Sequence, residues 1–146
     1  MAIILRGRSI SKGCAEGEAL VCREAIGFNF GLNVDNGVIT EYNHELFGKS
    51  IKDKILLFPH GKGSTGGSYV VYQMAKNRTG PKAIINLTTE TIIAVGAIMG
   101  RIPVIDSLEK NPYDFIADGD HVKVDADQGL VVIEKQRGAN HAPHRC

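Results

Sequence analysis

The sequence predicts a single α/β domain with a central β-α-β-α-β unit and antiparallel strands at its rim. Three short apolar runs alternate with two segments in which apolar residues recur at helical spacing. Strands that are joined through helices in this way run parallel, with right-handed crossovers. The chain has 146 residues, which is enough for one hydrophobic core but not for two. We therefore expect residues 1–136 to form one domain and residues 137–146 to form a disordered polar tail.

Antiparallel strands are expected before the central unit. In residues 7–22, small or apolar residues alternate with polar ones around Gly13 and Gly17, which indicates strands with a bulge or a tight turn. Further along, Asn36-Gly37 is a strong turn signal, and residues 43–50 are expected to form a loop.

The central unit begins with the apolar run 54–59, which predicts a buried strand that a proline ends. Apolar residues then recur at helical spacing over 70–75. Thr65 or Ser68 is available as the N-cap of this first helix, and Gly80-Pro81 is expected to end it.

A second strand is predicted at residues 82–87, followed by a short, largely apolar helix that ends at Gly100. Thr88 or Thr89 is available as its N-cap. The third strand follows at 102–106. Residues 119–135 then alternate between apolar and polar and turn at 127–129, which predicts an antiparallel hairpin.

Composition excludes several classes of function. The net charge is +1 and aromatic residues make up 6% of the chain, so nothing indicates a nucleic-acid partner. No apolar stretch is long enough to span a membrane, and the apolar start is too short for a signal peptide. The three cysteines form no CxxC pair and have no metal-ligand spacing. We expect reduced thiols, a cytoplasmic protein, and no metal bound by this chain alone.

The stretch "GKGSTGGS" at 61–68 is the candidate binding site. It joins the end of a buried strand to the start of a helix, which is where ligands bind in open α/β sheets. The unpaired amides at a helix N-terminus favour an anion, and glycines let the backbone approach it closely. The residues predicted to bind substrate here are Lys62, Gly63, Thr65, Gly66, Gly67 and Ser68.

Ser64 lies at the centre of this stretch and is a candidate general base. The stretch matches neither the P-loop pattern GxxxxGK[ST] nor the nucleophile pattern GxSxG, and a simple turn with capping hydroxyls stays open. A helix N-terminus stabilises an anion by at most about 2 kcal/mol. That energy corresponds to little more than about one pKa unit, which cannot ionise a serine. The remaining walls of such a site would have to come from a second chain.

Five segments together resemble the small-subunit, swivelling domain of the aconitase-X family, in its archaeal form. They are "RGRSISKGCAEGEALV", "NHELFGKSIKDKILLFPHGKGSTGGSYVVYQMAKN", "PKAIIN", "ETIIAVGAIMGRIPVID" and "GDHVKVDADQGLVVI". The resemblance covers nearly all of residues 5–134. Its most specific part is the combination of the "GKGST" stretch with "GAI" and the following "IPVID".

The resemblance implies a swivelling β/β/α fold and a heterodimer with a large subunit, whose cysteines hold an iron–sulfur cluster of the [4Fe-4S] type. It implies a hydro-lyase that converts (R)-5-phosphomevalonate into trans-anhydromevalonate 5-phosphate, in an archaeal-type mevalonate pathway of isoprenoid biosynthesis. The family's proton acceptor is the serine after "GKG", which here is Ser64. Related members dehydrate cis-3-hydroxy-L-proline, so that substrate is the nearest alternative.

Two other classes of function stay open. The end of the chain is also similar to the mobile phosphohistidine domain of PEP-using enzymes, but that function needs a histidine where residues 88–91 read Thr-Thr-Glu-Thr. A non-catalytic interaction domain is the other alternative. Two further polar residues are weaker candidates. Asp106 is expected at a strand end as a loop cap or a site residue, and Arg101 is a candidate contact for a phosphate.

Overall fold

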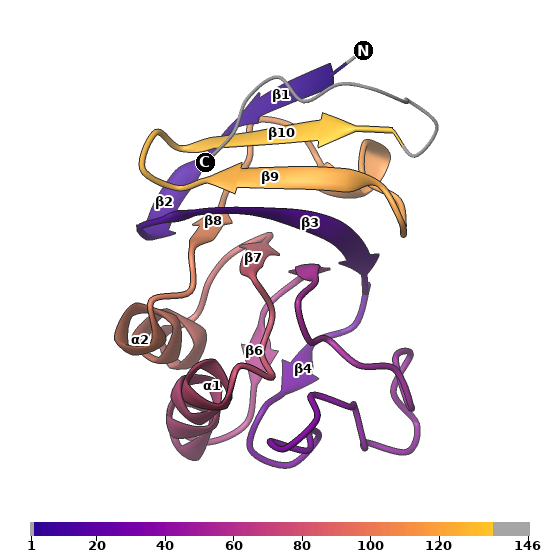
Figure 1. Ribbon diagram of the computed structural model, residues 1–146, viewed down its shortest axis with the longest axis vertical. Helices are drawn as coiled ribbons and strands as arrows, with labels where there is room; N and C mark the ends of the chain where they lie inside the picture. The colour runs from indigo at the N-terminus through magenta and orange to yellow at the C-terminus, as the bar shows by residue number, and fades with distance from the viewer. Residues whose placement is uncertain (1, 136–146) are drawn as a thin grey trace.

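The computed structural model describes residues 2–135, and the predicted tail at 137–146 lies outside the described residues (Figure 1). The main strands and helices, in chain order, are β1 (Ala2–Arg6), β2 (Arg8–Ser11), β3 (Cys14–Val21), β4 (Ile26–Gly27), β5 (Ile55–Phe58), β6 (Gly61–Lys62), α1 (Gly66–Asn77), β7 (Ala83–Asn86), α2 (Thr91–Gly100), β8 (Val104–Asp106), β9 (His121–Asp125) and β10 (Leu130–Glu134). A short 3-10 helix, Pro112–Asp114, precedes β9.

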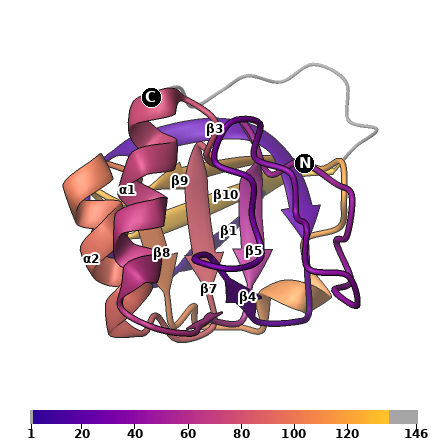
Figure 2. The same ribbon diagram turned by 90° about the horizontal axis from the view of Figure 1, so that it is seen from below.

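The large sheet has the strand order β1-β10-β9-β3-β5-β7-β8-β2. Its centre, β3-β5-β7-β8, is parallel, and the remaining pairs are antiparallel. Figures 1 and 2 show α1 and α2 side by side below the β5–β7–β8 part of this sheet. The predicted β-α-β-α-β unit with antiparallel strands at its rim is therefore confirmed.

Alternate residues of the central strands enter two different cores. Leu56 and Phe58 of β5 belong to the core that contains α1 and α2. Ile55 and Leu57 belong to the second core, between the parallel strands and the β1–β10–β9 part of the sheet. Both faces of these strands are buried, so they are continuously apolar, without the alternation of a half-exposed strand. This is why the short apolar runs predicted them correctly.

The two helices approach closely because glycines lie between them. A Cβ on Gly96 would be 2.7 Å from the Ser68 carbonyl oxygen and 2.7 Å from the Val71 Cβ, and one on Gly67 would be 2.9 Å from the Ile92 Cγ2. The Ser68 hydroxyl donates to the Ile92 carbonyl oxygen at 2.7 Å. Ser68 therefore links α1 to α2 and does not cap α1, as one of the two predicted caps would have required.

The other predicted helix starts also need correction. Thr65 stands at the N-cap of α1, but its side chain accepts no capping hydrogen bond. The N-cap of α2 is Glu90 rather than Thr88 or Thr89, and its carboxylate accepts two backbone N–H groups of the first turn. A glutamate side chain is long enough to reach back to these groups, so a threonine in the preceding position is not needed.

Both helices end in the same way. Arg78 follows α1 and Arg101 follows α2, each in the left-handed region with φ 61°. The N–H of each arginine then bonds to a carbonyl of the last turn. The end of α1 therefore lies before Gly80-Pro81, whereas Gly100 is the last residue of α2, as predicted.

Two of the three cysteines, Cys14 and Cys22, lie in the part of the chain that the structure describes. Cys22 is buried and free, whereas Cys14 is disulfide-bonded. The expectation of reduced thiols is thus confirmed for Cys22 and wrong for Cys14.

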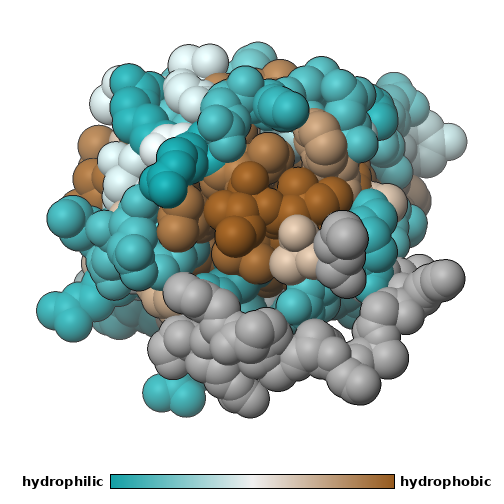
Figure 3. Space-filling view, turned by 90° about the horizontal axis from the view of Figure 1, so that it is seen from above, coloured by the Kyte–Doolittle hydropathy of each residue, from teal (hydrophilic) through white to brown (hydrophobic). Residues whose placement is uncertain are grey.

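Within residues 2–135, no helix is long and apolar enough to cross a bilayer. Figure 3 shows apolar side chains gathered at the end of the molecule where β1 and β10 lie, far from β6 and the start of α1.

Candidate functional site

The glycine-rich stretch begins as a strand rather than as a loop. Its first two residues form β6, which pairs in parallel with β4, so that Ile26 lies opposite Gly61 and Gly27 opposite Lys62. Because both strands run in the same direction, the residues that follow β4 come to lie beside the residues that follow β6. The pairing therefore brings two distant segments, 28–30 and 63–66, to one place at the start of α1.

Ser64 receives a hydrogen bond from one of these residues. The Asn29 side-chain amide donates from Nδ2 to Ser64 Oγ at 2.8 Å. Ser64 is exposed, and Gly63 before it adopts φ +103°. Asn29 was not predicted as a site residue, because it lies 35 positions away in the sequence and only the short β4–β6 pairing brings it close.

Three consecutive backbone amides, beginning with that of Ser64, are free at the start of α1. Within the described residues, the N–H groups of Ser64, Thr65 and Gly66 have no hydrogen-bond acceptor. The next two amides are occupied, since Gly67 donates to the Ser64 carbonyl at 2.9 Å and Ser68 to that of Thr65 at 3.1 Å. The first turn of α1 also contains no acidic residue. The free donors at a helix N-terminus favour an anionic ligand here.

Lys62 is close to this group, but its charge already has a partner. Lys62 Nζ lies 3.0 Å from Glu41 Oε2, and the two side chains are 43% and 34% exposed. Glu41 is a second residue that sequence reasoning missed. An anion that binds Lys62 has to compete with the Glu41 carboxylate, so the role of Lys62 in substrate binding stays a prediction.

The predicted site residues fall into two sets. Gly63, Ser64, Thr65 and Gly66 are exposed at the start of α1. Gly67 is buried against α2, and the Ser68 hydroxyl is bonded to α2. The second set therefore offers a ligand neither a free side-chain donor nor a free amide. Contact between any of these residues and a substrate remains a prediction.

Asp106 does not belong to the exposed group. Its carboxylate is fully buried and is bound by Arg8, whose Nε and Nη2 each lie at 2.9 Å, and by the Thr89 N–H at 2.7 Å. Burial raises the pKa of Asp106, but the hydrogen bonds from Arg8 and Thr89 outweigh it and hold the pKa below its usual value. Asp106 is thus a structural anion. Arg101 lies at the C-terminal end of α2, whereas Glu90 marks the other end of that helix.

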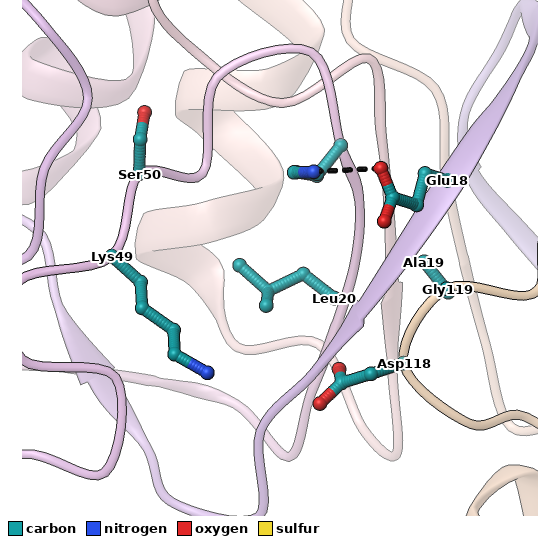
Figure 4. A pocket seen from close by; sticks show the side chains of 8 residues that line it. Glu18, Ala19, Leu20, Lys49, Ser50, Asp118 and Gly119 are labelled. Atoms are coloured by element: carbon teal, nitrogen blue, oxygen red, sulfur yellow. Dashed lines mark hydrogen bonds and ion pairs between the residues drawn. The ribbon is translucent and has the colours of Figure 1, made fainter.

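Two hollows of the surface are lined by residues other than Ser64. One, of about 440 Å³, is lined by Glu18, Ala19, Leu20, Lys49, Ser50, Lys54, Asp118 and Gly119. Lys54 Nζ lies 2.9 Å from Glu18 Oε1, and Figure 4 shows the Glu18 side chain on one side of the hollow. Another, of about 570 Å³, is lined by Arg101 and residues of β2 and the following turn, again without Ser64. Ser64 lies in neither of these two hollows, and its side chain is exposed on this chain.

The described residues offer no donor set for a metal centre. Among residues 2–135, no three side chains of His, Cys, Asp or Glu are grouped so that they could hold a metal ion. A cysteine-ligated cluster needs several thiolates in one place. These residues therefore do not offer the ligand set of a cysteine-ligated cluster.

Comparison with known proteins gives matches over nearly the whole chain. The family model described as "Aconitase X swivel domain" matches residues 4–133. A protein of Methanosarcina mazei named "Phosphomevalonate dehydratase small subunit" is 54% identical over 134 residues, which cover 92% of this chain and 93% of that protein. An Archaeoglobus fulgidus protein with the same name is 48% identical over 126 residues, covering 86% and 95%.

Two solved structures are similar throughout. A chain of the crystal structure of Thermococcus kodakaraensis aconitase X (holo-form) has a TM-score of 0.85 and 44% identity, and the match covers 91% of this chain and 99% of that one. The solution NMR structure of a UPF0107 protein has a TM-score of 0.80 and 46% identity, with coverage of 88% and 97%.

Proposed function

The chain belongs to the aconitase X swivel-domain family, and on this basis we propose that it is the small subunit of a phosphomevalonate dehydratase. The observation that carries the proposal is the 54% identity to a protein of that name over nearly the full length of both chains. The enzyme would remove water from (R)-5-phosphomevalonate to give trans-anhydromevalonate 5-phosphate. This places it in an archaeal-type mevalonate pathway.

Ser64 is the proposed proton acceptor. Its ionised hydroxyl takes a proton from the substrate carbon next to the carboxylate. The electron pair of that C–H bond forms the new double bond, and the hydroxyl on the neighbouring carbon leaves, to become water when it gains a proton. General base catalysis of this kind contributes about 10²- to 10⁴-fold in rate. The exposed Ser64 hydroxyl and the free amides beside it support this role.

The open position of Ser64 supports a second chain in the active site. A helix N-terminus lowers the energy of an anion by at most about 2 kcal/mol, far less than a serine needs to ionise near neutral pH. Exclusion of water makes the same donors much more effective. We therefore assign the other walls of the site to a large subunit, which forms a heterodimer with this chain.

The large subunit is also the proposed holder of an iron–sulfur cluster, of the [4Fe-4S] type. Such a cluster supplies a Lewis acid for the leaving hydroxyl. No group of side chains among residues 2–135 could hold a metal ion, so we assign the cluster ligands to the large subunit. The contribution of this chain is then Ser64 and the amides around it.

We assign the anionic parts of the substrate to the exposed set of residues. The contacts go to Gly63, Thr65 and Gly66, with Lys62 as the nearby cation. Gly67 and Ser68 come second, because their amides and the Ser68 hydroxyl have partners within the chain. We also place the enzyme in the cytoplasm, since a phosphorylated substrate does not cross a membrane unaided.

The phosphocarrier alternative requires a histidine at the start of the second helix. That position holds Glu90, whose carboxylate accepts the N–H groups of Ile92 and Ile93, each at 2.9 Å. The first turn of α2 thus offers no imidazole to carry a phosphate, and its amides are not free to bind one. Only the dehydratase and the non-catalytic interaction domain remain to be separated by experiment.

The test is an assay of the two subunits together. The chain is co-expressed with its large subunit, and loss of water is measured with 5-phosphomevalonate and with cis-3-hydroxy-L-proline. Ser64→Ala is expected to lower the rate by at least about 100-fold without changing assembly. Ser9→Ala, a serine on β2 away from the site, is the matched control.

Three outcomes would overturn parts of the proposal. Full activity of an assembled Ser64→Ala complex would remove Ser64 from the mechanism. Turnover of cis-3-hydroxy-L-proline alone would replace the substrate. An assembled wild-type complex that acts on neither compound would favour the non-catalytic interaction domain.

A further inference from the structure

We propose that Asn29 is the positioning residue of Ser64, and that its amide stabilises the ionised hydroxyl by donating a hydrogen bond to it. The inference rests on the proposed role of Ser64 as a base. The direct observation is the bond from Asn29 Nδ2 to Ser64 Oγ at 2.8 Å.

The backbone holds Asn29 firmly at this place. The residue before it, Phe28, is 2% exposed and packs against Phe58 of β5, with 6.0 Å between the ring centroids. Asn29 also follows directly on the β4–β6 pairing, whose last pair joins Gly27 and Lys62. One end of the segment is thus anchored in the core, and the Asn29 side chain reaches the surface beside Ser64.

Two glycines of the stretch make room for the Asn29 amide. A Cβ on Gly63 would lie 3.2 Å from Asn29 Oδ1, and a Cβ on Gly66 would lie 3.2 Å from Asn29 Nδ2. Contacts of this length are tighter than ordinary van der Waals contacts, so a side chain at either position would press against the amide. These glycines therefore do more than let a ligand approach, because they leave space for Asn29 between them.

The oxygen of the Asn29 side-chain amide supports the same orientation of the amide toward the Ser64 hydroxyl. Asn29 Oδ1 is buried, and no hydrogen-bond partner for it is found in the part of the chain that the structure describes. A buried acceptor without a partner is costly, and such groups are found where function requires them. The arrangement leaves Oδ1 unpaired, whereas Nδ2 is directed at Ser64 Oγ.

The direction of the bond decides its chemical effect. A donor to Ser64 Oγ stabilises the anion more than the neutral hydroxyl, and so favours loss of the proton. If the hydroxyl instead donated to Asn29 Oδ1, the bond would hold the proton on Ser64 and oppose ionisation. The two arrangements predict pKa shifts of opposite sign when Asn29 is removed, so that a single titration separates them.

The first experiment uses a thiol in place of the hydroxyl, because a thiol titrates in an accessible range. In the full chain carrying Ser64→Cys, the pKa of the new thiol is measured from the pH dependence of its alkylation, followed by peptide mass spectrometry. Adding Asn29→Ala is expected to raise this pKa by about one unit. Asn33→Ala is the matched control, since Asn33 lies in the same segment and its side chain accepts a hydrogen bond from the nearby Asp35 N–H at 2.8 Å.

A second variant covers loss of folding. Asn29→Asp keeps the shape of the side chain but at neutral pH presents a carboxylate, which cannot donate and which repels a thiolate. It is expected to raise the thiol pKa by more than Asn29→Ala does. Circular dichroism and thermal unfolding show whether each variant keeps the fold. An unchanged or lowered thiol pKa in a folded variant would overturn the proposal.

The second experiment uses the enzyme with its large subunit. Asn29→Ala is expected to lower kcat by about tenfold, which corresponds to one pKa unit, and to leave KM nearly unchanged. The alkaline rise of activity should shift to higher pH by a similar amount. A change in KM alone would mean that Asn29 binds substrate and does not act through Ser64.

The two experiments separate this inference from the proposed function. The thiol titration uses no substrate, so a shift there upholds the positioning role even if the complex does not dehydrate 5-phosphomevalonate. Conversely, a complex that is active, and that loses activity with Ser64→Ala but not with Asn29→Ala, would support the function and reject the positioning role.

Discussion

Each helix of the domain begins shortly after a strand, but the backbone N–H groups at the two helix starts differ in their hydrogen-bond partners. At the start of α2, the Glu90 carboxylate accepts the N–H groups of Ile92 and Ile93, each at 2.9 Å. Just before it, the Thr89 N–H donates to Asp106 at 2.7 Å. These donors are paired within the chain, and the carboxylates also complement the positive end of the helix dipole.

The start of α1 has none of these partners. Thr65 stands at its N-cap without a side-chain hydrogen bond, and the amides from Ser64 to Gly66 have no acceptor within residues 2–135. Ser64 is exposed, and its hydroxyl is bound by Asn29. Helix ends are normally capped by side chains, water or ligands.

The comparison indicates that the start of α2 stabilises the fold, whereas the start of α1 is available to bind a ligand. Acidic side chains accept the N–H groups at the start of α2, whereas the N–H groups at the start of α1 are left for water or a ligand. The same contrast explains why a phosphate carrier at α2 is a poor description, whereas an anionic substrate at α1 is a good one. The following changes test the contrast, from the largest expected effect to the smallest.

Asp106→Asn should weaken the α2 junction most. The substitution removes a buried charge that Arg8 and the Thr89 N–H both bind, and hydrogen bonds to charged groups are the stronger ones. We expect the free energy of unfolding to fall by about 2 kcal/mol, measured by urea denaturation. An unchanged midpoint would mean that this cluster does not stabilise the fold.

The same residue gives a pH dependence with a defined sign. The pKa of Asp106 in the folded protein lies below its ordinary value of 3.8. Its charge therefore contributes stability above the ordinary pKa, and this contribution is lost as the pH falls through the lower folded pKa. The stability of the wild type should fall more steeply below about pH 4 than that of Asp106→Asn. Parallel curves for the two proteins would contradict the assignment.

Removal of each N-cap side chain compares the helices directly. Glu90→Ala should lower the free energy of unfolding by about 1 kcal/mol, because two amides lose their acceptor. Thr65→Ala should change the free energy of unfolding by no more than about 0.5 kcal/mol, because no capping bond is lost. Equal effects at the two positions would show that the helix starts do not differ as described.

The elements were predictable from the sequence because their signals are local. The run at Ile55–Phe58 is continuously apolar because both of its faces are buried, and the hairpin of β9 and β10 alternates around a turn that includes Gly129. The site was predicted only in part. Ser64 lies in a distinctive stretch, but Asn29 and Glu41 reach it through folding of the intervening chain. Their sequence neighbours give no indication of this.

The errors at the helix caps have the same origin. Ser68 has the right residue type for a cap, but it lies inside the first turn of α1 and its hydroxyl bonds across to α2. Glu90 takes the capping role from Thr88 and Thr89 because its longer side chain reaches the free amides. Competition between local and tertiary partners decides such cases, and only the folded chain shows the tertiary ones.

Glu41→Gln should have the smallest effect on stability and a useful effect on binding. The ion pair with Lys62 is partly exposed, and such pairs contribute about 0–1 kcal/mol. The thermal midpoint should therefore change little. If Lys62 binds an anionic group of the substrate, the KM of the assembled enzyme should fall, because the competing carboxylate is gone. A rise in KM would mean that Glu41 instead holds Lys62 in place for the substrate.

The central claim is that the start of α1 is half of an active site, which a large subunit completes. Amide hydrogen exchange tests it most directly, with the chain alone and in the complex. Peptides that contain Ser64 to Gly66 should exchange rapidly in the free chain and become protected in the complex, whereas Ile92 and Ile93 should be protected in both. Equal exchange at Ser64 to Gly66 in the free chain and in an assembled complex would contradict the account.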